Sequence, residues 1–125
     1  EGCVLNGPTG LWLDGNDLYV TERAYNGNRI RRIDLAAKTI ETIAGALDGT
    51  AGNSGDGQLA LNALLAAPNA VAVDASKNIY VADSVNDVVR RIDGATKKIE
   101  TYAGGGTLRD GRAGQQAFDA RAGQR

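Results

Sequence analysis

One stretch of the sequence occurs twice, in the same order and at the same length. Residues 31–45 read RRIDLAAKTIETIAG, and residues 90–104 read RRIDGATKKIETYAG. The match extends to both sides, with the further pairs Pro8 and Pro68, Asp14 and Asp74, Tyr19-Val20 and Tyr80-Val81, and Asp56-Gly57 and Asp110-Gly111. A period of about 60 residues is typical of repeat proteins, in which every repeat forms one supersecondary unit. The sequence therefore predicts two copies of one structural unit.

Each copy divides into short β-prone stretches separated by turn residues. The first copy predicts strands at Gly10–Asp14, Asp17–Glu22, Asn28–Asp34 and Thr39–Ala44. The second copy predicts strands at Val71–Asp74, Asn78–Asp83, Asp87–Asp93 and Lys98–Ala103. Because the connections within each copy are short, each set of strands is expected to form an antiparallel meander.

Apolar residues occur on both faces of these expected sheets. Val88 and Val89 are neighbours in one strand and therefore point to opposite faces, and Tyr80, Val81 and Ala82 alternate in the same way. A sheet that is apolar on both faces needs cover on both, which neighbouring sheets of the same kind provide. The predicted fold class is all-β, a β-propeller segment of two four-stranded antiparallel blades.

The connection between the two copies has a different composition. Residues 46–57 are rich in Gly, Asn and Asp and predict a surface loop. Residues 58–67 contain helix formers and stop before Pro68, which predicts a short helix or helical turn with Asp56 as its N-cap. Its leucines are expected to pack against the blade edges; a stripe that binds a cofactor or partner is the other interpretation. The predicted division is 1–57 for blade 1 and its following loop, 58–111 for the helical linker and blade 2, and 112–125 for the start of a third repeat.

Composition narrows the classes of function. The net charge of −1 gives no bulk field that would attract nucleic acid or a membrane surface. No stretch is long and apolar enough to span a bilayer. Cys3 is the only cysteine, so an internal disulfide is excluded and a bond to another chain stays open. The absence of histidine makes several catalytic chemistries harder to perform with this chain alone.

Paired arginines recur in both copies, and they have two interpretations. Arg31-Arg32 and Arg90-Arg91 could form a basic stripe for phosphate or nucleic acid. No aromatic residues alternate with them, however, as single-strand binding would require. The favoured interpretation is internal, because the turn after Asp34 brings Glu41 level with the first pair, and Glu100 lies likewise beside the second. Arg31, Arg32, Glu41, Arg90, Arg91 and Glu100 are therefore predicted to form cross-strand ion pairs.

Acidic and amide residues at strand ends are the candidate ligand contacts. Glu22 and Asp83 end equivalent strands, and Asn26 and Asn86 follow them in the next loops. If a ligand lies on the rim of the blades, these four residues are predicted to contact it. The acidic turn at residues 14–17 is a weak calcium candidate, because it lacks EF-hand spacing and a bidentate closing acid. No catalytic residue, metal ligand or cofactor is predicted.

Several short motifs make the repeat similar to the NHL repeat. They are PTGL at 8–11, LYVTE at 18–22, NRIRRID at 28–34, IAG at 43–45, PNAVAVD at 68–74, NIYVADS at 78–84 and VRRID at 89–93. This resemblance implies a β-propeller, usually of six blades, with ligands near the central axis or on one rim. It also implies an extracellular or cell-surface location. Residues 121–123 depart from the pattern where a third proline is expected, and residues 25–27 lengthen one loop.

The resemblance leaves three functions open, because propellers host unrelated activities. The favoured one is a non-catalytic scaffold or recognition surface that binds a protein or glycan. The second is part of an NHL-type lyase; such lyases use histidines, so no catalytic residue carries over and the catalytic groups would lie outside this chain. The third is an RNA-binding propeller, which the near-neutral charge disfavours.

Two blades cannot close a ring, so the expected partners are further blades. These belong either to the same longer chain, which is the favoured interpretation, or to neighbouring copies assembled head to tail. A head-to-tail contact that does not close builds a filament.

Overall fold

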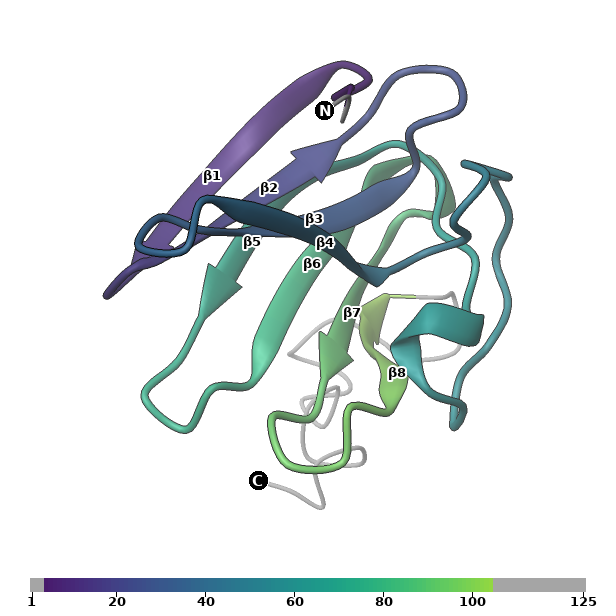
Figure 1. Ribbon diagram of the computed structural model, residues 1–125. Helices are drawn as coiled ribbons and strands as arrows, with labels where there is room; N and C mark the ends of the chain where they lie inside the picture. The colour runs from purple at the N-terminus through teal and green to yellow at the C-terminus, as the bar shows by residue number, and fades with distance from the viewer. Residues whose placement is uncertain (1–3, 105–125) are drawn as a thin grey trace.

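The structure, a computed structural model, describes residues 4–104. Two four-stranded antiparallel sheets, each a meander in chain order, make up this part of the chain (Figure 1). Blade 1 consists of β1 (Pro8–Asp14), β2 (Asp17–Glu22), β3 (Arg29–Asp34) and β4 (Thr39–Ala44). Blade 2 consists of β5 (Pro68–Val73), β6 (Ile79–Asp83), β7 (Val88–Ile92) and β8 (Ile99–Gly104). The all-β prediction and the two antiparallel blades are confirmed.

Aspartates close equivalent turns in the two blades. The Asp34 carboxylate accepts backbone hydrogen bonds from Ala36 and Ala37 at 3.0 and 2.9 Å in the β3–β4 turn. Asp93 accepts the corresponding bonds in the β7–β8 turn at 2.8 and 3.0 Å. A short carboxylate that satisfies the free N–H groups of a turn explains why these hairpins form at the same position in each repeat.

Cross-strand rows of residues give every blade two different faces. In blade 1 one row is Leu13, Leu18, Ile33 and Ile40, and in blade 2 the equivalent row is Val73, Ile79, Ile92 and Ile99. We call the side of the sheet that carries this row the aliphatic face. The neighbouring row, on the opposite side, is Trp12, Tyr19, Arg32 and Glu41 in blade 1 and Ala72, Tyr80, Arg91 and Glu100 in blade 2. We call that side the tyrosine face.

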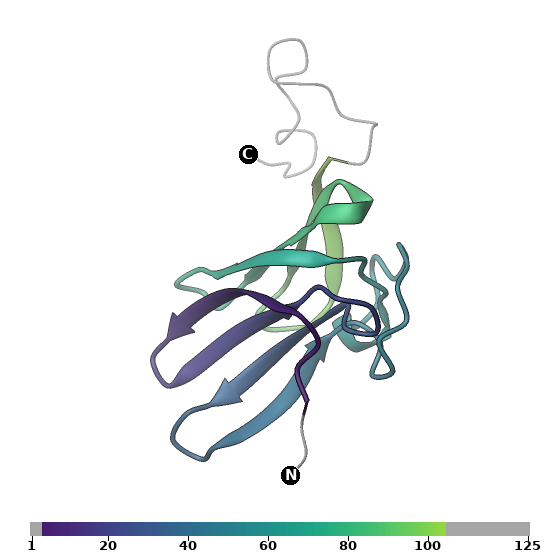
Figure 2. The same ribbon diagram turned by 90° about the horizontal axis from the view of Figure 1, so that it is seen from above.

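The two blades stack with the aliphatic face of blade 2 on the tyrosine face of blade 1. Tyr19 belongs to the same buried cluster as the four residues of the aliphatic row of blade 2. Strands β1 and β5 pack on each other at one edge, so the two sheets lie as successive layers (Figure 2). Gly10 makes this approach possible, because a Cβ there would meet the backbone of Asn69 and Ala70. A 2.6 Å ion pair between Lys77 and Asp14 joins the blades at the surface.

The linker lies along the other edge, beside β4 and β8, and differs from the predicted helix. A single 3-10 turn, η1 (Ala60–Asn62), replaces the helix expected over 58–67. The Ala60 carbonyl accepts from Gly45 after β4, and the Ala60 N–H donates to Lys97 before β8. Because backbone bonds to both blades extend the segment, an α-helix cannot continue there. The leucines do pack on the blades in part: Leu65 is fully buried, whereas Leu61 is half exposed.

Asp56 is not the N-cap that the sequence predicted. Leu59 stands at that position without a side-chain cap bond, and Asp56 instead pairs with Arg90. A second short turn, η2 (Ser84–Asn86), connects β6 and β7. Cys3, Asp110-Gly111 and the predicted third repeat at 112–125 lie outside the described residues. Within residues 4–104 there is no helix long and apolar enough to cross a membrane.

Candidate functional site

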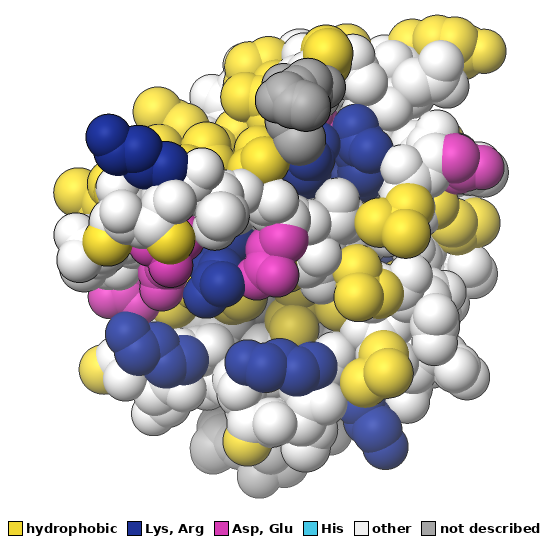
Figure 3. Space-filling view, viewed as in Figure 1, with side chains coloured by type: hydrophobic (Ala, Val, Ile, Leu, Met, Phe, Trp, Pro, Cys, Tyr) yellow, Lys and Arg dark blue, Asp and Glu magenta, His cyan; other side chains and the backbone are white. Residues whose placement is uncertain are grey.

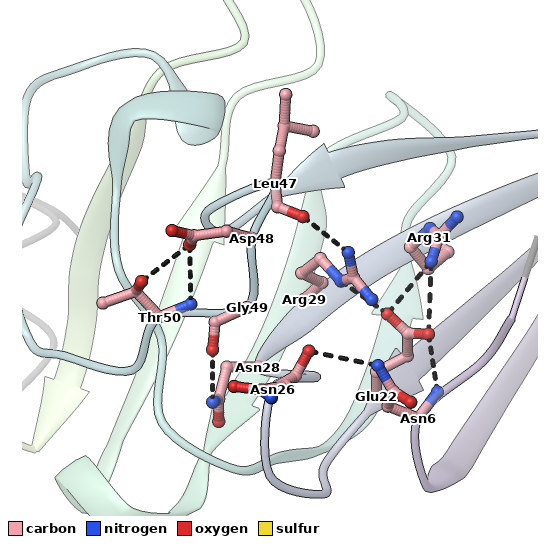
Figure 4. A network of polar contacts seen from close by, with 10 residues as sticks. All are labelled: Asn6, Glu22, Asn26, Asn28, Arg29, Arg31, Leu47, Asp48, Gly49 and Thr50. Atoms are coloured by element: carbon pink, nitrogen blue, oxygen red, sulfur yellow. Dashed lines mark hydrogen bonds and ion pairs between the residues drawn. The ribbon is translucent and has the colours of Figure 1, made fainter.

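The acid that ends β2 is the centre of a buried polar network in blade 1. Glu22 has no exposed side-chain surface. Its carboxylate accepts from Arg29 Nε at 2.7 Å, from Arg31 Nη1 at 3.2 Å and from the Asn6 backbone N–H at 2.9 Å (Figure 4). Strand pairing explains the contact with Arg29, because Glu22 and Arg29 are opposite each other across β2 and β3.

Blade 2 repeats this arrangement with an aspartate. Asp83, also fully buried, accepts from the Ala66 N–H at 2.7 Å and from Asn86 Nδ2 at 2.8 Å. Arg90 lies 3.3 Å from the Asp83 carboxylate and 3.0 Å from Asp56 of the linker. It also donates to the backbone carbonyls of Ser54 and Leu64 at 3.1 and 3.2 Å. The linker is thus tied to the blade through one buried guanidinium.

The predicted rim contacts are therefore placed differently from one another. Glu22 and Asp83 are enclosed, and their oxygens already accept bonds from inside the repeat, so they do not present a ligand surface. Asn86 is half-buried and donates to both Asp83 and the Gly52 carbonyl. Asn26 is exposed, and its carbonyl accepts from Asn6 at 3.2 Å. The exposed loop of Asn26 and Tyr25 is the part of this prediction that remains on the surface.

The two arginines of each pair form ion pairs with different acids. Arg32 lies 2.7 Å from Glu41, and Arg91 lies 3.7 Å from Glu100, as the turn geometry predicted. Arg31 and Arg90 also form cross-strand ion pairs, but their partners are Glu22 and Asp83 on the preceding strands, which corrects the expected pairing with Glu41 and Glu100. Adjacent residues of a strand point to opposite faces, so only one arginine of each pair can reach the acid across the turn.

The aliphatic face of blade 1 is an apolar surface that the two described blades leave partly uncovered. In blade 2 the row Val73, Ile79, Ile92 and Ile99 is 8%, 8%, 2% and 1% exposed. In blade 1 the equivalent Leu13 is 60% exposed, and Leu11 beside it is 64% exposed. The same apolar row is buried in blade 2, whereas in blade 1 Leu13 is exposed and Leu18, Ile33 and Ile40 are half-buried.

The described residues do not gather ligands for a metal. Within residues 4–104 no group of three or more His, Cys, Asp and Glu side chains is placed to hold an ion. The charged side chains of these residues instead form ion pairs, buried at Glu22 and Asp83 and exposed at Glu41 and Lys77.

Two stacked four-stranded blades with complementary faces define the chain as a β-propeller-type repeat protein. A solved structure described as "Streptogramin B lyase structure" is similar to this chain, with a TM-score of 0.54 and 21% sequence identity. The match covers 82% of this chain and 28% of that one, so the chain spans less than a third of the length of the structure it resembles. At this identity the likeness shows the fold alone. No protein-family profile matches the chain, and no curated protein sequence matches it significantly.

Proposed function

We propose that the chain is a non-catalytic segment of an NHL-type β-propeller, in which each blade is a docking surface for the next. The open aliphatic face of blade 1 carries this proposal. The equivalent face of blade 2 is buried against a tyrosine face. The partner that fits the open face is therefore another blade that presents Tyr, Arg and Glu in the same row.

The chain itself carries a matching surface at its other end. The tyrosine face of blade 2 bears Tyr80, Arg91 and Glu100, which correspond to Tyr19, Arg32 and Glu41 of blade 1. An edge-to-face contact between Tyr80 and Tyr102, with ring centres 5.5 Å apart, preforms part of this surface. One end thus complements the other, which supports head-to-tail stacking on further blades of a longer chain or on another copy.

Charge pairing supports a scaffold over a nucleic-acid binder or an enzyme. Arg31 and Arg90 are buried on acids, and Arg32 and Arg91 lie against acids on the surface. Paired arginines release few counterions on meeting a phosphate backbone, so they contribute little to affinity for RNA. The scaffold is proposed to act outside the cell or at its surface, with a protein or glycan as the recognised ligand.

A lyase segment is the second candidate, because the similar solved structure is described as a lyase. In that case the chain would supply blades, and the catalytic groups would lie outside this chain. Turnover of a streptogramin B antibiotic by a longer protein that contains these blades, and not by the isolated chain, would support this candidate over the scaffold.

The association of the chain with itself tests the scaffold. Light scattering after size exclusion should give a molar mass that rises with concentration, because open apolar faces of this kind associate. Leu13→Glu should shift the chain to monomer, since it places a charge in the aliphatic row of the open face, on the edge strand β1. Leu47→Glu is the control, as Leu47 is 71% exposed in the linker and lies outside both faces. A wild-type chain that stays monomeric at every concentration would contradict the proposal.

A further inference from the structure

A pocket of about 360 Å³ lies in the wedge between the two blades. Its floor is aliphatic, with Ile79 and Ile92 from blade 2 and Ile43 from blade 1. Leu59 and Leu61 of the linker also line it, and each is about half exposed, so they stand at its mouth. Because all its walls belong to these two blades and their linker, the pocket does not depend on further blades.

Donor groups from both blades meet at this pocket. Arg32 comes from blade 1, and Lys97 comes from the β7–β8 turn of blade 2. The Arg32 guanidinium lies 2.7 Å from Glu41 and 3.6 Å from Asp17. Its Nε atom, however, is buried and has no hydrogen-bond partner among residues 4–104. Because that atom has no accessible surface, an occupant of the pocket would meet Arg32 through its Nη atoms, which also contact Glu41 and Asp17.

Tyr19 adds a neutral donor to the pocket lining. Its side chain is 7% exposed, and burial together with the charge of Asp17 raises the pKa of the phenol. The hydroxyl therefore stays protonated over the working pH range. The one acid of the lining, Glu41, already accepts from Arg32. The Lys97 ammonium donates to the Gly94 carbonyl at 2.9 Å, but no acid among residues 4–104 forms an ion pair with it, so its charge is available to an anionic ligand.

The shape of the recess agrees with this chemistry. Figure 3 shows hydrophobic side chains at the base of a hollow near the middle of the face, with basic side chains around it and an acid beside one of them. A volume of about 360 Å³ is at the small end of the range for small-molecule pockets. The occupant must therefore be small, apolar over most of its surface, and able to accept hydrogen bonds at one end.

We propose that this interblade pocket binds a small carboxylic acid with an apolar body. The apolar part lies on Ile79 and Ile92, and the carboxylate lies between Arg32 and Lys97. A neutral apolar molecule of the same size would use the floor but would leave the Lys97 ammonium without a negative partner. The pocket lies between the two faces that already stack within the chain and not on the open aliphatic face of blade 1, so it does not depend on the proposed association with further blades.

Binding of 2-naphthoate to the whole chain tests the site, with 2-naphthylmethanol as the neutral probe of similar shape. Isothermal titration and ligand-observed saturation-transfer NMR suit the experiment, since neither requires a monomeric protein. Naphthoate is expected to bind at least about fivefold more tightly than the alcohol, because charge-assisted hydrogen bonds exceed neutral ones. Equal affinity of the two probes would overturn the assignment to a carboxylic acid.

Neighbouring residues supply matched variants. Lys97→Gln should weaken naphthoate binding about fivefold, whereas Lys98→Gln, one residue away and outside the lining, should leave it unchanged. Arg32→Gln should weaken it similarly, and Arg91→Gln, the equivalent residue on blade 2, should not. Lys97 is exposed, so its variant tests the site even if Arg32→Gln unfolds the chain. Unchanged affinity in Lys97→Gln, or equal losses in Lys97→Gln and Lys98→Gln, would overturn the proposal.

Discussion

Arg90 is the bulkiest side chain that the described residues bury completely. A guanidinium is tolerated there because Asp83, Asp56 and two backbone carbonyls surround it. Removing charged groups from water costs several kcal/mol per ion, so the cluster contributes specificity more than net stability. It fixes the linker on blade 2, because the linker alone supplies Asp56 and both carbonyls.

Removal of one partner of this cluster should be severe. Asp83→Asn leaves Arg90 buried with Asp56 as its remaining acidic partner. We expect a loss of about 3 kcal/mol in the free energy of unfolding. Glu100→Gln breaks an exposed pair and should cost less than about 1 kcal/mol. Urea unfolding of both variants at one protein concentration measures the difference. Similar losses in the two would show that the Asp83 pair is not the stronger one.

Turn aspartates should make stability depend on pH in the acid range. Asp74 accepts backbone bonds from Asn78 and Ser76, and chiefly the Asn78 bond lowers its pKa below the ordinary 3.8. A lowered folded pKa gives stability that is complete above the ordinary value and is lost as the pH falls through the folded one. Asp93 is shifted in the same direction by backbone bonds from Thr96 and Ala95.

Replacement of Asp74 isolates its share of this dependence. Asp74→Ala should be less stable than the parent at about pH 6, and the gap should narrow as the pH falls below the ordinary pKa of 3.8 and through the lowered folded one, because the parent carboxylate then becomes protonated too. Thermal unfolding across this range follows the gap. A gap of constant size would mean that the Asp74 charge does not contribute.

At the level of elements, the repeat made the strands predictable and left the connections unpredictable. The strands at Asp17–Glu22 and Thr39–Ala44 have the predicted bounds, because alternation and turn residues both mark their ends. Strands β1 and β5 begin earlier than predicted, at Pro8 and Pro68. In both strands a shift in register separates the proline from the regularly paired residues that follow. Such an irregular position tolerates a residue without an N–H group.

The linker and the rim acids needed tertiary contacts that local sequence does not carry. Helix formers at residues 58–67 indicated a helix, but backbone bonds to β4 and β8 favour an extended course. Likewise, Glu22 at a strand end was expected on the surface, and only the register of β2 on β3 places it beside Arg29. The helix propensity of a segment predicts its conformation poorly where the segment bridges two sheets.

Gly45 and Gly104 end the last strand of each blade in the same unusual conformation. Their φ values are 93° and 92°, and a Cβ on either would meet the carbonyl oxygen at the start of the neighbouring strand, that of Asn28 or Asp87. Gly45→Ala combines backbone strain with this clash, so it should cost more than about 1 kcal/mol of stability. Gly15→Ala is the control, with a positive φ but open space around it. If Gly45→Ala and Gly15→Ala lost equal stability in chemical denaturation, the close approach of the carbonyl oxygen would not contribute.

At the scale of the whole molecule, the two faces make the chain directional. The aliphatic face of blade 2 is covered by blade 1, whereas the aliphatic face of blade 1 is open. The tyrosine face of blade 2, at the other end, bears Tyr80, Arg91 and Glu100. A contact between unlike faces is heterologous, so it propagates unless the rotation per blade closes a ring. An antiparallel contact between two like faces would instead stop at a dimer. These two modes predict different behaviour of variants that damage one face each.

Mixing two such variants separates the modes. Leu13→Glu damages only the aliphatic face of blade 1, and Ala72→Glu damages only the tyrosine face of blade 2, where Ala72 occupies the position of Trp12. Each variant alone should be monomeric, since a stack of unlike faces needs both faces intact. An equimolar mixture should form a one-to-one heterodimer, because the first variant keeps its tyrosine face and the second keeps its aliphatic face.

Sedimentation of the two variants, alone and mixed, reads out this result, with far-UV circular dichroism to verify that each is folded. If like faces paired instead, Ala72→Glu alone would still dimerise through its intact aliphatic face, and mixing would add no new species. The heterodimer should also resist moderate salt, because an aliphatic row and not an ion pair forms its centre. Dissociation of the heterodimer by moderate salt would instead assign the contact to Arg91 and Glu100. The open aliphatic row of blade 1 would then not pack as the buried row of blade 2 does.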